Sequence, residues 1–434
     1  MSKASHGAAD TSQKVGGGGH ERDLSDFVCA ILPRVHSIAP DAGADVFILE
    51  DPYVSDLLAT SVSELGLPVL DTPMARERLT GNATELILGD AEFAAAASRP
   101  GARLYSNSEN AIGWIAEHLD HTDLPRRIGL FKDKIAFRRL AADLYPGYRF
   151  FGMTLSEMRT FDPTRLRAPF IIKPAVGFFS MGVHVVESAQ AWPGVVAQIE
   201  REVETFAAVY PEQVLGLDRF VAEEIIEGEE FAVDAYFDAD GRPVLVDVLA
   251  HLFASADDVS DRVYYTSAET VERLAPPAME FLAEVGRRAG LTDFPVHAEL
   301  RIDVTDHVAP IEINPMRFGG WCATDLAHFA YGVNPYRCYL RGESPDWKHI
   351  AEQTAGRTTA LIVSDLPSTV DLPAIESVDY KRFASRFSSV IELRPTDFNR
   401  YPVFAFTFVD VPSDDLSELH AVLGADLREY LRMR

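Results

Sequence analysis

Residues 296–314 contain two short runs of alternating apolar and polar side chains, and this period of two predicts a pair of β-strands. Residues two apart on a strand share a face, so Glu299 and Arg301 lie together on the first strand. Glu312 and Asn314 likewise share a face of the second strand. A tight turn between the two runs would place Glu299 directly across from Glu312. The pattern therefore predicts which strands pair and which face carries charge.

The facing carboxylates of Glu299 and Glu312 indicate a metal site. Two like charges directly opposite each other destabilise a sheet, and a divalent cation between them would remove this repulsion. Two carboxylates and an amide oxygen from Asn314 are the hard oxygen ligands that Mg2+ prefers. The alternative is a solvated strand face that carries a few charges.

A second candidate site follows the predicted strand 170–173. Lys173 ends this strand, and a loop with glycines at positions 177 and 182 leads to the next strand. Glycines permit backbone geometry in which N–H groups point at phosphate oxygens, and the lysine supplies a point charge for the same phosphates. The loop is not a Walker loop, because no Gly-Lys-Ser/Thr sequence precedes a helix. The alternative is an ordinary β-hairpin with a buried lysine stem.

Two further segments carry polar residues suited to a nucleotide. Residues 219–231 read Arg-Phe-Val-Ala-Glu-Glu-Ile-Ile-Glu-Gly-Glu-Glu-Phe. Backbone groups in such a segment can read an adenine edge, and a carboxylate beyond the glycine can bind ribose hydroxyls. A charged hairpin is the alternative. Asp133 is the predicted N-cap of a helix, with Lys132 and Lys134 beside it; a solvent-exposed lysine is the alternative there.

Composition narrows the class of partner. The chain is 47% hydrophobic and has a formal net charge of -26. This predicts a folded protein whose surface repels phosphate backbones, so no nucleic acid partner is expected. The three cysteines show no disulfide or zinc pattern. No apolar run reaches the ~18 residues needed to span a bilayer, and no apolar signal core is visible. We therefore expect no membrane partner and a cytoplasmic location.

The patterning divides the chain into four segments. Residues 1–23 are polar and include four consecutive glycines, which predicts a mobile tail. Residues 24–125 alternate strand and helix patterns, typical of a small parallel α/β sheet, although no G-x-G-x-x-G dinucleotide fingerprint follows the first strand. Residues 126–345 are richer in strands. Residues 346–434 form another α/β region.

Periodicity and turn signals also predict the individual elements. The predicted strands are 46–49, 68–70, 86–88, 170–173, 183–186, 219–226, 231–237, 243–249, 296–304 and 308–314. The predicted helices are 54–65, 133–144 and 271–290, the last ending at a glycine, and 238–241 is a predicted hairpin turn.

The order of these motifs resembles that of the ATP-grasp superfamily. The motifs are Asp-Lys, then Lys-Pro with a glycine loop, then Glu-Glu-x-x-x-Gly-x-Glu, and finally His-x-Glu with Glu-x-Asn-Pro-x-Arg-x-Gly-Gly. They extend from about residue 126 to residue 342, about half of the chain. The resemblance implies an α/β fold class in which an ATP-grasp domain of two lobes (an α+β grasp), residues 126–345, follows the small parallel α/β domain. Residues 346–434 would be a C-terminal α/β extension.

The resemblance also implies a role for each matched residue. Lys134 matches the first nucleotide lysine and Lys173 the second, with Lys132 replacing Lys134 if the helix register differs. The loop that closes on the phosphates corresponds to 176–182, with ATP contacts at Gly177, Ser180, Met181 and Gly182. The adenine-reading hinge and the ribose carboxylate correspond to Glu223, Glu224, Ile225, Ile226 and Glu230.

The remaining matches concern the chemistry. Glu299, Glu312 and Asn314 match the metal ligands, in agreement with the strand-face argument. The catalytic set comprises Lys173, Arg317, which matches the arginine facing the acyl-phosphate region, and Arg301, which would hold a substrate carboxylate or an ATP phosphate.

The reaction that the resemblance implies is an ATP-dependent ligation with Mg2+, or Mn2+ in its place. Members of this type, such as L-amino acid ligases and dipeptide synthetases, activate a carboxylate as an acyl phosphate. An amine then attacks, giving an amide or dipeptide with ADP and phosphate. The expected partners are small-molecule carboxylate and amine substrates, and family habit suggests a homodimer. The alternatives are a carboxylate–thiol ligase and a non-catalytic ATP-binding regulatory protein.

Overall fold

The computed structural model describes residues 45–177, 182–206, 216–254 and 261–434. Contacts divide the chain into residues 1–38 and 39–434, and every described residue belongs to the second unit. The predicted tail, residues 1–23, lies outside the described residues, as does the first part of segment 24–125. Within the described ranges, no helix combines the length and the apolar character needed to cross a membrane.

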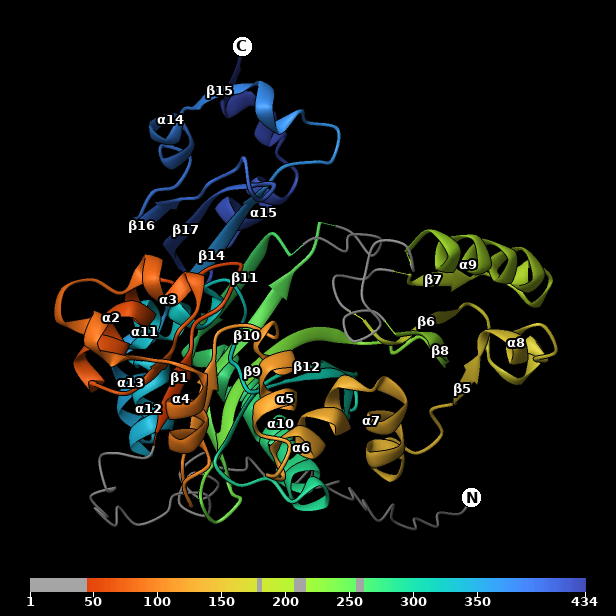
Figure 1. The fold of residues 1–434 in the computed structure, drawn as a ribbon. Coiled ribbons are helices and arrows are strands. Elements are labelled where there is room, and N and C mark those ends of the chain that lie inside the picture. Colours follow the sequence, from red (N-terminus) through yellow and green to blue (C-terminus); the bar gives the residue numbers. More distant parts are fainter. Residues whose placement is uncertain (1–44, 178–181, 207–215, 255–260) are drawn as a thin grey trace, which may run out of the picture. The chain divides into compact units, whose positions relative to one another are not determined.

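Four short strands near the start of the described chain form a parallel sheet in the order β3-β2-β1-β4. The strands are β1 (Val46–Ile48), β2 (Val69–Leu70), β3 (Ile87–Leu88) and β4 (Leu104–Ser106). The helices of this region are α2 (Asp56–Leu65), α3 (Pro73–Arg78), α4 (Asp90–Ala97) and α5 (Ala111–His118). Figure 1 shows β1 of this sheet next to helix α4. β1 is fully buried, as expected of a parallel strand that is covered on both faces. The predicted parallel sheet is confirmed.

A second sheet has four antiparallel strands in the order β5-β8-β6-β7. The strands are β5 (Phe150–Thr154), β6 (Phe170–Val176), β7 (His184–Val186) and β8 (Gly216–Glu224), and the helices are α8 (Leu155–Met158) and α9 (Trp192–Phe206). Phe170 and Ile172 of β6 share a buried cluster with Trp192 of α9. Because side chains alternate along a strand, Lys173 lies on the opposite face of β6 from α9.

The largest sheet has eight strands in the order β13-β12-β9-β10-β11-β14-β17-β16, and every neighbouring pair is antiparallel. Its first five strands are β9 (Glu229–Phe237), β10 (Pro243–Leu252), β11 (Val263–Ser267), β12 (Phe294–Ile302) and β13 (Val308–Pro315). The helices beside them are α6 (Leu124–Lys132), α7 (Lys134–Ala141) and α10 (Ala268–Ala289). The hairpin turn predicted at 238–241 joins β9 to β10.

Helix α10 packs against the large sheet through one apolar face. Leu274, Ala278 and Leu282, spaced four residues apart, share a buried cluster with Val233 of β9. The helix ends at Gly290, which has φ +64° and donates its backbone N–H to the Gly286 carbonyl. The predicted glycine stop signal is therefore confirmed.

The last part of the chain adds three strands to the large sheet and also forms a separate two-stranded sheet from β15 (Ile375–Val378) and β18 (Leu431–Met433). β14 (Arg357–Asp365) pairs with β11, and β17 (Val403–Pro412) and β16 (Val390–Pro395) follow it outward. The other elements are α11 (Leu326–Tyr331), α12 (Pro335–Arg341), α13 (Trp347–Thr354), α14 (Tyr380–Ala384) and α15 (Ser417–Leu423). The domain boundaries at 125/126 and 345/346 stay predictions.

Candidate active site

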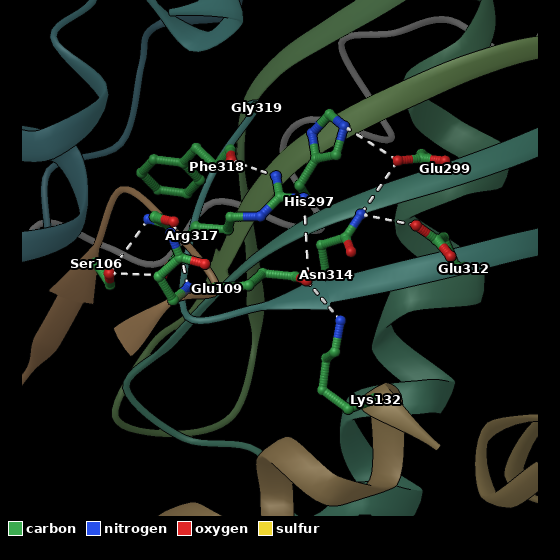
Figure 2. A network of polar contacts seen from close by, with 12 residues as sticks. Ser106, Glu109, Lys132, His297, Glu299, Glu312, Asn314, Arg317, Phe318 and Gly319 are labelled. Carbon is green, nitrogen blue, oxygen red and sulfur yellow. Dashed lines mark hydrogen bonds and ion pairs between the residues drawn. The ribbon is translucent and has the colours of Figure 1, made fainter. Parts of the chain in front are cut away.

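Three polar side chains meet on the paired strands β12 and β13. Glu299 is the direct partner of Glu312 in the antiparallel register, and His297 is the partner of Asn314. The Nδ2 of Asn314 donates to Oε1 of Glu299 (3.1 Å) and to Oε1 of Glu312 (3.3 Å). Figure 2 shows the amide between the two carboxylates. The predicted opposition of the two carboxylates is therefore confirmed.

The charges of this group favour a cation. Burial raises the pKa of Glu299 well above its usual range, and the facing charge of Glu312 raises it further. Burial also acts to raise the pKa of Glu312, but Lys134 and Lys173 hold it down to about 2. Glu299 thus resists ionisation because it is buried and because it faces a charged carboxylate. A divalent cation would let both ionise, and an Asn314 amide turned over would present its oxygen.

The side-chain oxygens of Glu299, Glu312 and Asn314 suit Mg2+, and they would fill part of its coordination shell. In the described part of the chain, no three His, Cys, Asp or Glu side chains gather as a metal-binding cluster. The group on β12 and β13 has two carboxylates and one amide. Mg2+ is usually held by one or two carboxylates together with substrate phosphates and water. Glu299, Glu312 and Asn314 would therefore hold an ion that arrives with a nucleotide.

Lys132 ends α6 and Lys134 begins α7, with Asp133 between them. Asp133 caps α7 as predicted, because its carboxylate accepts hydrogen bonds from two backbone N–H groups of the first turn, at 2.9 and 3.1 Å. Lys134 follows the cap, and its Nζ lies 3.5 Å from Oε2 of Glu312. The Nζ of Lys132 instead lies 2.5 Å from Oε2 of Glu109. Of the two lysines, Lys134 is therefore the ion-pair partner of Glu312.

Lys173 is held by a buried carboxylate. Its Nζ lies 2.7 Å from Oε1 of Glu223, which is a buried residue of β8. The same carboxylate receives two hydrogen bonds from Arg138 of α7. Burial lowers the pKa of Lys173, and the charge of Glu223 opposes this effect. The side chain of Glu223 therefore contacts Lys173. The backbone of the predicted adenine hinge begins at the next residue.

The predicted hinge connects β8 to β9. Glu224 ends β8, and its carboxylate accepts the backbone N–H groups of Arg149 (3.1 Å) and Arg167 (3.3 Å). Ile225 and Ile226 follow, between the two strands. The backbone groups of these residues therefore lie between a strand of the four-stranded antiparallel sheet and a strand of the large sheet, and their role in reading adenine stays a prediction.

Arg301 points at the hinge. Its guanidinium donates to the carbonyl of Ile226 and forms an ion pair with Glu230, at 2.8 Å from Nη2 to Oε2. Burial acts to raise the pKa of Glu230, but hydrogen bonds from His251 and Arg301 lower it overall. Arg301 therefore belongs with the predicted ribose carboxylate, and its catalytic role stays a prediction.

The predicted phosphate loop is described only at its ends. Gly177 follows β6 directly, and Gly182 precedes β7 with φ +70°. A Cβ at Gly182 would lie 3.0 Å from Cγ of Pro174, so a larger residue would be crowded as well as strained. Ser180 and Met181 lie outside the described residues.

A loop after β13 presents Arg317. The loop contains two residues with positive φ, Met316 (+69°) and Trp321 (+59°). The Nη1 of Arg317 donates to the Phe318 carbonyl (3.0 Å), and its Nη2 lies 3.8 Å from Oε1 of Glu109 (Figure 2). Arg317 thus lies beside the carboxylate of Glu109, in the loop that follows β4 of the parallel sheet.

Sequence reasoning missed Glu109 and Asp234. Glu109 lies just beyond the carboxyl end of β4, an edge where α/β sheets commonly bind ligands, and this position was the available signal. Asp234 is fully buried on β9 and accepts from Nδ1 of His297 (2.7 Å) and from the N–H of Gly319 (2.8 Å). It thus ties the strand of Glu299 to the loop of Arg317. An acidic residue within an apolar strand was its only signal.

Comparison with known proteins identifies the fold. Residues 166–325 match the family model described as an ATP-grasp domain. No curated protein sequence matches the chain. The L-amino acid ligase from Bacillus licheniformis has a TM-score of 0.62 at 16% identity, covering 91% of this chain and 99% of that one.

Two further solved structures are similar. Phosphoribosylglycinamide synthetase from Anaerococcus prevotii has a TM-score of 0.57 at 12% identity, covering 90% of this chain and 99% of that one. A biotin carboxylase from Campylobacter jejuni, solved as a β,γ-ATP complex, has a TM-score of 0.58 at 11% identity, covering 90% and 92%. At such identities the likeness establishes the fold. The chain therefore has the ATP-grasp fold, and its residues 166–325 match the ATP-grasp domain model.

Proposed function

We propose that this chain is an ATP- and Mg2+-dependent ligase that activates a carboxylate as an acyl phosphate and joins it to an amine. The products would be an amide or dipeptide, ADP and phosphate. The observation that carries the proposal is the group formed by Glu299, Glu312 and Asn314, with Lys134 3.5 Å from Glu312. It combines a hard-oxygen metal site with a neighbouring cation, the two kinds of group that stabilise the charge of a transferring phosphoryl group.

The chain's own residues would hold the nucleotide at both ends. Lys134 and Lys173 supply positive charge for the phosphates, while the backbone from Glu224 to Ile226 meets the adenine. Glu230 accepts from the ribose hydroxyls. When bound, Mg2+ would neutralise phosphate charge and favour phosphoryl transfer.

The reaction then consists of two balanced steps. An oxygen of the substrate carboxylate bonds to the γ-phosphorus, the bond from that phosphorus to the bridging oxygen breaks, and ADP leaves. The amine nitrogen next bonds to the acyl carbon, the acyl–oxygen bond breaks, phosphate leaves, and the nitrogen loses a proton. Arg317, on a loop held by Asp234, would stabilise the negative charge that both steps develop.

The pair formed by Glu109 and Arg317 supports an amino acid as the carboxylate substrate. Oε1 of Glu109 is buried and accepts no hydrogen bond from the described residues, and it lies 3.8 Å from Nη2 of Arg317. An arginine can bind a substrate carboxylate, and a neighbouring carboxylate can accept an ammonium group. An α-amino acid carries both groups two bonds apart.

Phosphorus NMR with Mg2+-ATP and a mixed pool of amino acids and small acids tests the proposal, together with mass spectrometry of the products. ADP, phosphate and a new amide mass are expected. AMP with pyrophosphate would replace the acyl-phosphate route by adenylation. A thioester mass after addition of coenzyme A would favour a carboxylate–thiol ligase. Tight ATP binding without turnover in any pool would favour a regulatory protein.

A further inference from the structure

Arg138 is buried on α7 and contacts both β8 of the four-stranded antiparallel sheet and β13 of the large sheet. Its Nε and Nη2 donate to the two carboxylate oxygens of Glu223, at 2.7 and 3.1 Å. Its Nη1 and Nη2 donate to the carbonyls of Pro310 and Ile311, both at 2.9 Å. Ile311 is the extra residue of a β-bulge in β13, directly before Glu312. One guanidinium thus contacts the strand behind Lys173 and the strand of the metal carboxylate.

Glu223 therefore forms ion pairs with two cations at once, Arg138 and Lys173. The side chains of Glu223 and Arg138 are 3% and 4% exposed, and that of Lys173 is 12% exposed. Burial acts to raise the pKa of Glu223, but Arg138 and Lys173 hold it at about 2. A single cation would already neutralise this carboxylate, so one of the two is available for another anion.

The geometry shows which cation is the exchangeable one. Arg138 makes a bidentate contact and is fixed by two further carbonyls, so its fork cannot turn away without losing four hydrogen bonds. Within the described ranges, Lys173 contacts Glu223 through its Nζ alone, at the end of a flexible side chain. Movement of Lys173 away from Glu223 therefore disturbs far less of the site.

We propose that Arg138 is a positioning residue that keeps Glu223 neutralised, so that Nζ of Lys173 is free to pass from this carboxylate to the phosphates of ATP. The inference rests on the proposed function, because it requires a nucleotide at Lys173. Without Arg138, Glu223 would have Lys173 as its sole cation, and binding of a phosphate would leave a buried charge uncompensated.

Calorimetric titration with Mg2+-ATP tests the inference on four proteins: wild type, Arg138→Met, Glu223→Gln and the double variant. Arg138→Met is expected to weaken ATP binding by about tenfold to a hundredfold, because the lone carboxylate retains Lys173. The double variant is expected to bind ATP more tightly than Arg138→Met, because nothing then retains Lys173. A structural role alone predicts the opposite, since removing a second buried group adds damage.

Arg288→Met is the matched control. Arg288 also donates to a carbonyl of α7, that of Leu140 (3.0 Å), but it lies on α10 and pairs with Glu284. Its ATP affinity is expected to equal that of the wild type. Thermal unfolding confirms that each variant is folded. If Arg138→Met does not fold, Arg138→Gln with and without Glu223→Gln gives the same comparison, since glutamine removes the charge but keeps N–H donors for the buried carbonyls.

The outcomes separate the inference from the proposed function. Binding of ATP by the wild type, with a double variant as weak as Arg138→Met, would overturn the inference alone. Wild-type affinity in Arg138→Met would do the same. No binding of Mg2+-ATP by the wild type would overturn the proposed function and the inference together.

Discussion

Glu109 and Arg317 lie in loops that follow strands of different sheets, and Oε1 of Glu109 lies 3.8 Å from Nη2 of Arg317. Glu109 follows a strand of the parallel sheet, and Arg317 follows β13 of the large sheet. The site is therefore completed by a residue outside the region that matches the ATP-grasp domain model.

Glu109→Gln tests whether this pair binds an amino acid. We expect KM for the carboxylate substrate to rise about tenfold or more, because a charged acceptor is lost, while KM for ATP changes little. Steady-state kinetics with each substrate varied in turn gives the two values. Glu117→Gln, an exposed change on α5, is the control. An equal rise in both KM values would mean that Glu109 acts on the whole site and not on the amino acid.

Glu312→Ala tests the metal site. We expect Mg2+-dependent ADP release to fall by about a hundredfold or more, because a ligand is lost that also faces Lys134. The fold should persist, since the change removes one of two like charges in the β12–β13 ladder. Coupled ADP assays across a Mg2+ titration and circular dichroism measure the two effects. Wild-type-like ADP release would refute the metal assignment.

Asp133→Ala tests the start of α7. The loss of the N-cap should lower the free energy of unfolding by about 1 kcal/mol. Because Lys134 follows the cap directly, KM for ATP should also rise. Asp133→Ser retains a capping oxygen and should restore both properties in large part, as urea unfolding and kinetics would show. Serine failing to restore KM would point instead to the ion pair between Asp133 and Arg219.

Gly228→Ala tests the turn between β8 and β9. Gly228 has φ +125°, and a Cβ there would lie 2.4 Å from the Ile302 carbonyl oxygen. We expect a loss of about 2 kcal/mol or more in the free energy of unfolding. Gly66→Ala, also at positive φ but with open space, separates backbone strain from the clash. Equal losses in the two variants would exclude the clash.

Asp247→Asn tests a buried acid pair. Asp247 is the direct partner of Asp234 in the β9–β10 register, and the Oδ2 atoms of both are buried without a hydrogen bond in the described chain. Burial raises the pKa of Asp247 well above 3.8, and Asp234 raises it further. The folded state therefore binds a proton that the unfolded state releases. This contribution to stability is present at low pH and is lost as pH rises through the folded pKa.

The asparagine variant should remove this pH dependence. We expect Asp247→Asn to be more stable than the wild type at neutral pH, by about 1 kcal/mol, with a difference that grows as pH rises. Urea unfolding between acid and mildly alkaline pH gives the comparison. A variant that is less stable than the wild type at high pH would contradict the claim that the buried Asp247 carboxylate is destabilising when it is charged.

The sequence predicted those parts of the site that depend on local pattern. The opposition of Glu299 and Glu312 follows from a period of two and a short turn, both of which can be read along the chain. The cap at Asp133 and the stop at Gly290 are likewise local. These features needed no knowledge of the tertiary fold.

Contacts between distant segments were beyond such reasoning. Arg138 reaches its two carbonyl partners because β13 carries a bulge at Ile311, and no local pattern marks that bulge. Glu109 reaches Arg317 only once two sheets are assembled. The predicted contacts of Ser180 and Met181 fall outside the described residues and stay predictions.

The pairing of β11 with β14 predicts what happens when the chain is truncated. A truncation after residue 345 would remove β14 and leave five paired positions of β11, from Val263 to Ser267, without their neighbours. An open strand edge of this kind recruits other chains and promotes aggregation. A chain that ends at residue 345 is therefore expected to be insoluble, and the final segment is expected to prevent self-association by covering this strand edge.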